Sequence, residues 1–232
     1  MKTLFLYQRI CKKGGRYMPK GDSTMKKLLH IIATPRGEES RTLKVSSAFI
    51  EAVRWNNGHW AFDELNLFTE KLPELGINHL NGKYTLMSGK NITPELQPYW
   101  DQVTCHIDRF LSANAYLIST PMWNFGIPYK LKQYIDIIVQ PRYLFQYTSS
   151  GVEGLAKDRR MVVISSRGGD YSGEPMKSMD TIEPYLKTVF GFVGIRDISF
   201  VNVQPMDAMG PDIRNQRIHD AQEQARALAA HF

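Results

Sequence analysis

The chain has 232 residues, of which 43% are hydrophobic and 22% are charged, which is an ordinary globular composition. Its net charge of +6 is uneven: residues 1–24 hold six basic side chains and one acidic, so the remainder carries a net charge of only +1. A remainder so close to neutral does not support a nucleic-acid-binding surface. No apolar run approaches the roughly 18 residues of a membrane-spanning helix, so we expect a soluble protein with no membrane partner.

Residues 1–24 do not resemble the rest of the chain. The apolar piece 3–7 is too short for a signal-peptide core, and a strand pattern begins directly after Met25. We expect 1–24 to be a disordered extension or an upstream translation start, and 25–232 to form one domain. The two cysteines, Cys11 and Cys105, lie far apart and give neither metal-ligand spacing nor a disulfide framework. We therefore expect a cytoplasmic protein with no metal site.

Strand and helix patterns alternate from Met25 onward. Short apolar runs predict buried strands, and apolar residues in helical spacing predict the helices between them. The predicted strands are 27–33, 60–68, 115–119, 160–165 and 198–203; the predicted helices are 43–55, 94–111, 128–139, 180–192 and 211–232, with a short hairpin near 144–151. Segment 69–93 has no clear period, and a connection that long is usually functional. The alternation predicts an α/β fold with a parallel sheet of about five strands and helices on both faces, a three-layer sandwich.

The loops after the first, third and fourth predicted strands leave the same edge of such a sheet. In the flavodoxin-like strand order 2-1-3-4-5, the first and third strands flank the point where FMN lies. The first loop places Thr34, Ser40, Arg41 and Thr42 at the start of a helix, where free N–H groups and the helix dipole favour a phosphate. The hydroxyls are equally compatible with helix capping. No dinucleotide-type or P-loop glycine pattern is present, which leaves a monophosphate as the ligand.

The second and third loops offer backbone donors and flat apolar surface. The second contains Met122, Trp123, Asn124 and Phe125, and the third contains Ser166, Arg167, Gly168 and Gly169. Two adjacent glycines allow a close backbone approach, although a glycine pair alone also fits a plain turn. A planar heterocycle with polar edges would fit between the two loops.

The ordered motifs are Ser-x-Thr after the first strand, Pro-Met-Trp-Asn-Phe-Gly-Ile-Pro-x-x-Leu-Lys-x-Tyr-Ile-Asp, then Phe-x-Tyr-Thr-x-x-Gly-x-x-Gly-Leu, then Ser-Ser-Arg-Gly-Gly. From about Lys27 to the C-terminus, this set resembles the FMN-dependent NADH-azoreductases, which belong with the flavodoxin-like NAD(P)H:quinone oxidoreductases. The likeness implies FMN phosphate and ribityl contacts at Thr34, Ser40, Arg41 and Thr42, ring contacts at Met122, Trp123, Asn124 and Phe125, and a pocket completed by Ser166, Arg167, Gly168 and Gly169.

Three residues depart from the family pattern. Trp123 stands where tyrosine is frequent, which keeps a flat surface but removes a hydroxyl. Arg41 stands where glutamine is common, and its charge could strengthen phosphate binding. Thr34, beside Pro35, replaces a serine at the first contact. Segment 69–93 also aligns poorly with the family, and we expect it to shape substrate choice.

The likeness implies a homodimer in which NADH or NADPH passes a hydride to FMN, and a quinone or azo compound then takes up two electrons at the same ring face. Tyr147 would contact the acceptor, although a packed hairpin tyrosine is an equally good interpretation. Tyr129, Tyr134, Ile138 and Phe145 would form a dimer face or belong to the core. The alternative function is a flavodoxin-type FMN electron carrier that does not oxidise NADH, but such carriers are usually smaller and acidic.

Overall fold

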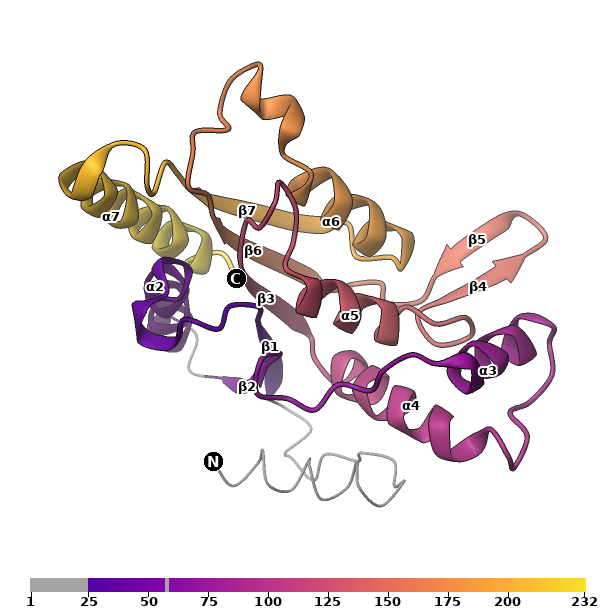
Figure 1. Ribbon diagram of the computed structural model, residues 1–232. Helices are drawn as coiled ribbons and strands as arrows, with labels where there is room; N and C mark the ends of the chain where they lie inside the picture. Colours follow the sequence, from indigo (N-terminus) through magenta and orange to yellow (C-terminus); the bar gives the residue numbers. More distant parts are fainter. Residues whose placement is uncertain (1–24, 57–58) are drawn as a thin grey trace.

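The computed structural model describes residues 25–56 and 59–232, and its centre is a parallel sheet of five strands (Figure 1). The strands are β1 (Lys26–Ile32), β2 (Trp60–Asn66), β3 (Ala115–Pro121), β6 (Arg160–Ser166) and β7 (Asp197–Val203), in the order β2-β1-β3-β6-β7. A separate hairpin, β4 (Phe145–Thr148) with β5 (Gly151–Gly154), lies outside the sheet. With the hairpin set aside, the sheet strands stand in the order 2-1-3-4-5. Because every pair is parallel, all five strands end at one edge.

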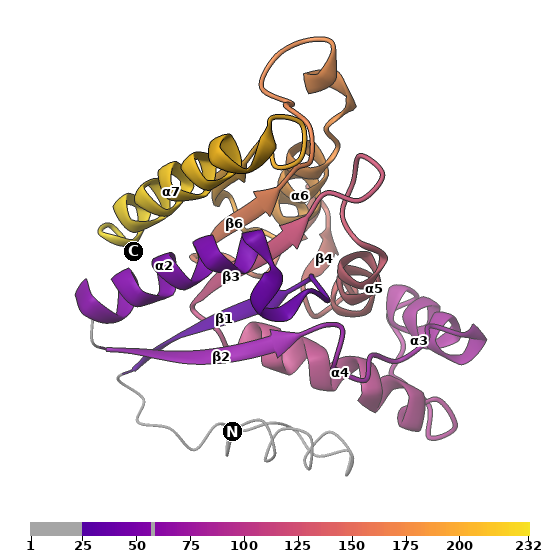
Figure 2. The same ribbon diagram turned by 60° about the vertical axis from the view of Figure 1, so that its left-hand side comes forward.

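Helices cover both faces of the sheet, because side chains along each strand point alternately to either side. Leu28 of β1 packs against α2 (Arg41–Asn56) and α7 (Gly210–Ala229), which lie side by side in Figures 1 and 2. Its neighbour Leu29 belongs to the core on the other face, with residues of α4 (Gln97–Leu111), α5 (Tyr129–Ile138) and α6 (Ile182–Phe192). Burial on both faces explains why β1 and β3 are continuous apolar runs rather than alternating ones.

The contact between α2 and α7 follows from residue size. Val45, Phe49 and Val53 of α2 recur every four residues and are all fully buried. The facing stripe of α7 consists of alanines, including Ala225 and Ala229, which are also fully buried. Small side chains at this spacing let the two helices approach closely, and each buried large side chain of α2 contributes about 1.5–3 kcal/mol.

Helix α3 (Ile77–Met87) lies inside the segment for which the sequence showed no period. Only three of its residues are buried, and two of them, His79 and Gly82, are not large apolar residues. Gly82 is where α3 meets α4: a Cβ there would lie 2.6 Å from the ring of Trp100. The sequence pattern gave no sign of this helix, because the contact position is a glycine and the periodic signal depends on apolar side chains.

A cluster of charges fixes the edge strand β2 to α4. Arg109 is 1% exposed and binds Asp63 at 2.7 Å and Glu70 at 3.4 Å, while Lys27 binds Asp63 at 2.8 Å. Burial alone would raise the pKa of Asp63, but the hydrogen bond and charge of Arg109, together with Lys27, hold it below its ordinary value. The cluster binds an edge strand of the sheet to α4.

Within residues 25–56 and 59–232, no helix is both long and apolar enough to cross a bilayer, and no group of histidine, cysteine or acidic side chains could hold a metal ion. Cys105 is disulfide-bonded, so the expectation of no disulfide was wrong. Wide separation in sequence does not prevent pairing, because only spatial distance decides it. The interpretation of 1–24 concerns residues that the structure does not describe.

Candidate cofactor site

The three predicted loops meet at the carboxyl edge of the sheet. The N–H of Met122 donates to the carbonyl of Ser166 at 2.8 Å, and the hydroxyls of Thr42 and Ser166 lie 2.8 Å apart. The N–H of Ala33 donates to the carbonyl of Ser119, also at 2.8 Å. These contacts join the ends of β1, β3 and β6, and we call the surface formed by residues 34–42, 121–128 and 166–171 the rim.

The first loop combines a helix cap with free donors. Ser40 is 2% exposed, and its hydroxyl accepts a hydrogen bond from the N–H of Leu43 at 3.3 Å, so the capping interpretation holds for this residue. Thr34 is equally buried and accepts from the N–H of Arg36 at 3.4 Å. Among the described residues, the N–H groups of Arg41 and Thr42 donate to nothing. Two free donors at the positive end of α2 can bind an anion.

Arg41 connects the first loop to a fourth loop, which the sequence reasoning missed. Its guanidinium donates to the carboxylate of Asp207 at 2.6 Å and to the carbonyl of Met206 at 3.2 Å. Asp207 follows β7, and its own N–H donates to the carbonyl of Gly168 at 3.0 Å. A Cβ on Gly168 would lie 3.1 Å from the Asp207 carboxylate, so a side chain there would push the carboxylate back by a few tenths of an ångström. The predicted parallel sheet could have identified this loop, because β7 ends at the same edge of the sheet as the strands that carry the other three loops.

In the second loop, half of the predicted backbone donors are already used. The N–H of Met122 is bound to Ser166, and the N–H of Trp123 donates to the carbonyl of Gly126 at 2.9 Å. Within the described part of the chain, the N–H groups of Asn124 and Phe125 make no hydrogen bond. Both residues are in the left-handed region, with φ of 48° and 68°. That conformation costs roughly 1–2 kcal/mol per residue for a side chain with a Cβ, which is a strain that functional sites often hold.

An aromatic cluster stands beside this loop. Trp123 is 37% exposed and Phe125 is 44% exposed. The ring of Trp123 lies 5.9 Å from that of Phe68 and 6.4 Å from that of Tyr129, and Phe68 and Tyr129 are 6.1 Å apart. Phe68 follows β2 and Tyr129 begins α5, and the sequence analysis assigned neither to the cofactor site. Exposed aromatic faces next to free N–H donors suit a flat ring with polar edges.

The third loop can offer its backbone groups to a ligand at the rim, but it does not offer the side chain of Arg167. That side chain is 1% exposed and turns inward, with 2.6–2.8 Å contacts to Asp180, Ser165 and Asn202. It fastens the loop to the start of α6 and leaves no guanidinium for a ligand at the rim. The carbonyl of Phe125 accepts from Thr181 at 2.8 Å, so the start of α6 also supports the second loop.

Tyr147 is far from the rim of its own chain. It is 60% exposed on β4, where its ring lies 5.8 Å from that of Phe145. Phe145 in turn lies 4.8 Å from Phe192 at the end of α6, close to the start of β7. The hairpin therefore sits toward the amino edge of the sheet, opposite the rim (Figure 1).

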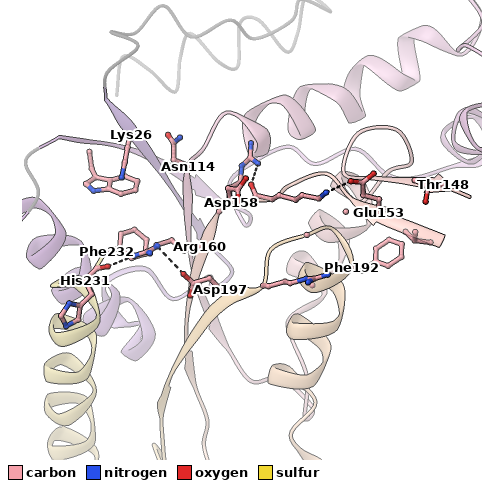
Figure 3. A pocket seen from close by; sticks show the side chains of 18 of the residues that line it. Lys26, Asn114, Thr148, Glu153, Asp158, Arg160, Phe192, Asp197, His231 and Phe232 are labelled. Carbon is pink, nitrogen blue, oxygen red and sulfur yellow. Dashed lines mark hydrogen bonds and ion pairs between the residues drawn. The ribbon is translucent and has the colours of Figure 1, made fainter. Parts of the chain in front are cut away.

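A large hollow is also at the amino edge and is lined by none of the predicted site residues (Figure 3). It has a volume of about 1310 Å³ and is rich in basic side chains, but several of them are engaged. Arg160 lies 3.6 Å from Asp197 and donates to the carbonyl of His231 at 2.6 Å, and Lys157 pairs with Glu153. Arg159 donates to the carbonyls of Ala113 and Leu111, each at 3.1 Å. Size alone does not identify the site, because the free donors and exposed aromatic faces lie at the rim.

Comparison with known proteins shows which family the chain belongs to. A family model described as a flavodoxin-like fold matches residues 26–229. An FMN-dependent NADH:quinone oxidoreductase of Nitratidesulfovibrio vulgaris (strain DP4) is 37% identical over 209 residues, which are 90% of this chain and 100% of the relative. The chain belongs to this family. A relative of the same name from Coprothermobacter proteolyticus is 35% identical, with the same coverage of both chains.

Solved structures of the family have the same fold. An FMN-dependent NADH-azoreductase from Bacillus anthracis (Ames Ancestor), in complex with FMN, superposes with a TM-score of 0.77 at 32% identity and covers 88% of this chain and 100% of its own. An azoreductase from Bacillus anthracis (Sterne) gives a TM-score of 0.82 at 28% identity, covering 90% and 100%. The resemblance to the azoreductases found in the sequence is thus confirmed.

Proposed function

We propose that the protein is an FMN-dependent NADH:quinone oxidoreductase that also reduces azo compounds, built as a three-layer α/β sandwich and acting in the cytoplasm. The observation that carries the proposal is the rim: four free N–H groups, two from Arg41 and Thr42 and two from Asn124 and Phe125, next to exposed aromatic faces. These groups match a cofactor with an anion at one end and a flat, polar-edged ring at the other. The names of relatives at 35–37% identity over the same region support the same chemistry.

The residues of the rim fall into groups that would contact different parts of FMN. The phosphate and ribityl chain of FMN would be held at the start of α2 by Arg41 and Thr42, with Thr34 and Ser40 shaping the turn. The ring would lie against Trp123 and Phe125 and receive the N–H groups of Asn124 and Phe125, with Met122 at its edge. Ser166, Gly168 and Gly169 would allow the ring to approach the backbone. Arg167 would act from beneath, by holding this loop in place.

When bound, FMN would supply the chemistry that takes a hydride from NADH or NADPH and reduces the acceptor by two electrons, and donor and acceptor would occupy the same ring face in turn. The N–H groups of Asn124 and Phe125 would favour negative charge on the ring edge that they face. Trp123 and Phe125 would exclude water from that face. No side chain at the rim has to act as a strong acid or base.

The family likeness also leads us to propose a homodimer, although most of the face suggested by the sequence is not available for one. Tyr134 and Ile138 are fully buried in their own chain and Phe145 is 5% exposed, so these three belong to the core, whereas Tyr129 is 63% exposed. Exposed apolar residues lie instead along α3, where Ile77 is 69% and Tyr84 64% exposed. This α3 face would bind a second copy. In such a dimer, Tyr147 would reach an acceptor only in the site of the other subunit.

Titration of the purified protein with FMN, followed by steady-state oxidation of NADH with menadione or methyl red as acceptor, tests the proposal. We expect FMN to bind one per chain and NADH oxidation to require an acceptor. A protein that binds FMN without oxidising NADH would be an electron carrier of the flavodoxin type. A protein that binds no FMN would refute both functions.

A further inference from the structure

A chain of hydroxyl groups runs through the apolar core between the sheet and α2, and it ends at the rim. His30 Nε2 of β1 lies 2.7 Å from the hydroxyl of Ser119 on β3, and that hydroxyl lies 2.6 Å from the hydroxyl of Ser46 on α2. Ser46 donates to the carbonyl of Thr42 at 3.0 Å, and the hydroxyl of Thr42 meets that of Ser166 on β6 at 2.8 Å. The chain links three strands to the first turn of α2.

Only one set of directions lets all three hydrogen bonds from His30 to Thr42 form at the same time. Each serine hydroxyl has a single hydrogen to donate. Since Ser46 donates to the carbonyl of Thr42, it must accept from Ser119, and Ser119 must then accept from His30. His30 therefore carries a hydrogen on Nε2, and the hydroxyl rotors of Ser119 and Ser46 are both fixed.

These polar groups are buried where apolar residues would be expected. Ser46 and Ser119 are fully buried, Thr42 is 1% exposed and His30 is 5% exposed, next to Leu28 and Leu117 on the same face. Burial lowers the pKa of His30 to about 3, so the ring is neutral at physiological pH. A neutral hydrogen-bonded chain contributes little net stability over well-packed apolar side chains. Unlike apolar packing, these hydrogen bonds fix the orientation of the groups that they join as well as the distance between them.

What the chain orients is the first turn of α2. Thr42 is held from two sides, through its carbonyl by Ser46 and through its hydroxyl by Ser166. The same turn carries the free N–H groups of Arg41 and Thr42. Groups that bind an anion must be held within about 0.5 Å of the productive geometry, and this requires supporting hydrogen bonds behind them.

We propose that His30 is a positioning residue for the phosphate of the cofactor, acting through Ser119 and Ser46 on the first turn of α2. The inference rests on the proposed function, because it assigns a remote determinant to the same FMN site. His30 does not touch the cofactor. It sets the orientation of the groups that do.

The test compares FMN with riboflavin, which has the same ring but no phosphate. His30→Leu removes the donor, whereas His30→Gln keeps an amide N–H at nearly the reach of Nε2. We expect His30→Leu to raise the FMN dissociation constant about fivefold and the riboflavin constant by less than about twofold, the scale of one lost hydrogen bond. His30→Gln should restore most of the FMN affinity. Leu28→Val, two residues away on the same face of β1, is the control: it should lower the melting temperature and leave the ratio of the two constants unchanged.

An unchanged ratio of FMN to riboflavin affinity in folded His30→Leu would overturn the inference while leaving the proposed function intact. If His30→Leu does not fold, Ser46→Ala breaks the same chain with a residue that favours helix, and the ratio must then change there. In the wild type, ¹⁵N NMR of the imidazole should show a neutral ring protonated on Nε2, and the other tautomer would also overturn the inference. A wild type that binds riboflavin and FMN equally would refute the phosphate site itself.

Discussion

Phe125 provides a test that separates the cost of backbone strain from the contribution of the aromatic ring to cofactor binding. Its φ of 68° is one that an L residue with a Cβ adopts only at a cost of roughly 1–2 kcal/mol, and glycine adopts it freely. We therefore compare Phe125→Gly with Phe125→Ala. Both variants lose the ring, so the difference in their stabilities isolates the backbone strain.

The expected difference follows from two opposing effects. Alanine at position 125 retains the left-handed penalty of roughly 1–2 kcal/mol, while glycine loses about 0.4–1 kcal/mol through the greater freedom of its unfolded chain. Glycine should thus be the more stable variant by about 0.5–1 kcal/mol, or about 1–4 °C in melting temperature for a chain of this size. Thermal unfolding without FMN measures this difference. Both variants should bind FMN more weakly, by up to about tenfold, because the aromatic face is lost.

The matched control is Ser47, an exposed residue inside α2. There the order should reverse, with Ser47→Ala more stable than Ser47→Gly by about 1 kcal/mol, as in any helix interior. Should Phe125→Ala prove as stable as Phe125→Gly, position 125 stores no strain, and its left-handed conformation says nothing about function.

Three further predictions test other parts of the structure. Arg41→Gln should weaken FMN binding several-fold and make binding less sensitive to salt, which titrations at two ionic strengths would show; equal salt dependence would contradict a charge contact. Because Arg109 and Lys27 hold the pKa of Asp63 low, that carboxylate stabilises the fold above its ordinary pKa near 3.8, and this contribution is lost as the pH falls through the folded value. Asp63→Asn should therefore be less stable at pH 7 but lose less stability in acid, as urea melts at pH 7 and pH 3 would show; parallel losses would contradict this. Gly82→Ala should destabilise despite its better helix propensity, because its Cβ would lie 2.6 Å from the ring of Trp100, and a raised melting temperature would show that the ring moves aside.

Much of the fold could be predicted because the relevant signals are local. The runs that became β1 and β3 are apolar on both faces, and that pattern indicates a buried parallel strand. Parallel strands then place the following loops at one edge, and this brought three distant segments together without any knowledge of their contacts. Helix α3 escaped detection because its buried positions hold His79 and Gly82, whose role depends on Trp100 in another helix.

The site itself was predictable in its location and less so in its details. The sequence selects Arg167 as a basic residue in the right loop, but only the carboxylate of Asp180 explains why its side chain turns inward. It likewise does not show that Asp207, on a loop after the last strand, would contact Arg41. His30 reads as an isolated polar residue in a strand until Ser119 and Ser46 are seen beside it. Such pairings are tertiary, and no local pattern encodes them.

The central claim is that free N–H groups and aromatic faces at the carboxyl edge of the sheet hold FMN as a hydride acceptor for a nicotinamide. The most direct measurement is the visible spectrum of the FMN-loaded protein, recorded anaerobically before and after one equivalent of NADH and then after menadione. The account predicts a yellow protein that bleaches with NADH and regains its colour with the quinone. A spectrum that NADH leaves unchanged, or a protein that stays colourless when titrated with FMN, would contradict it.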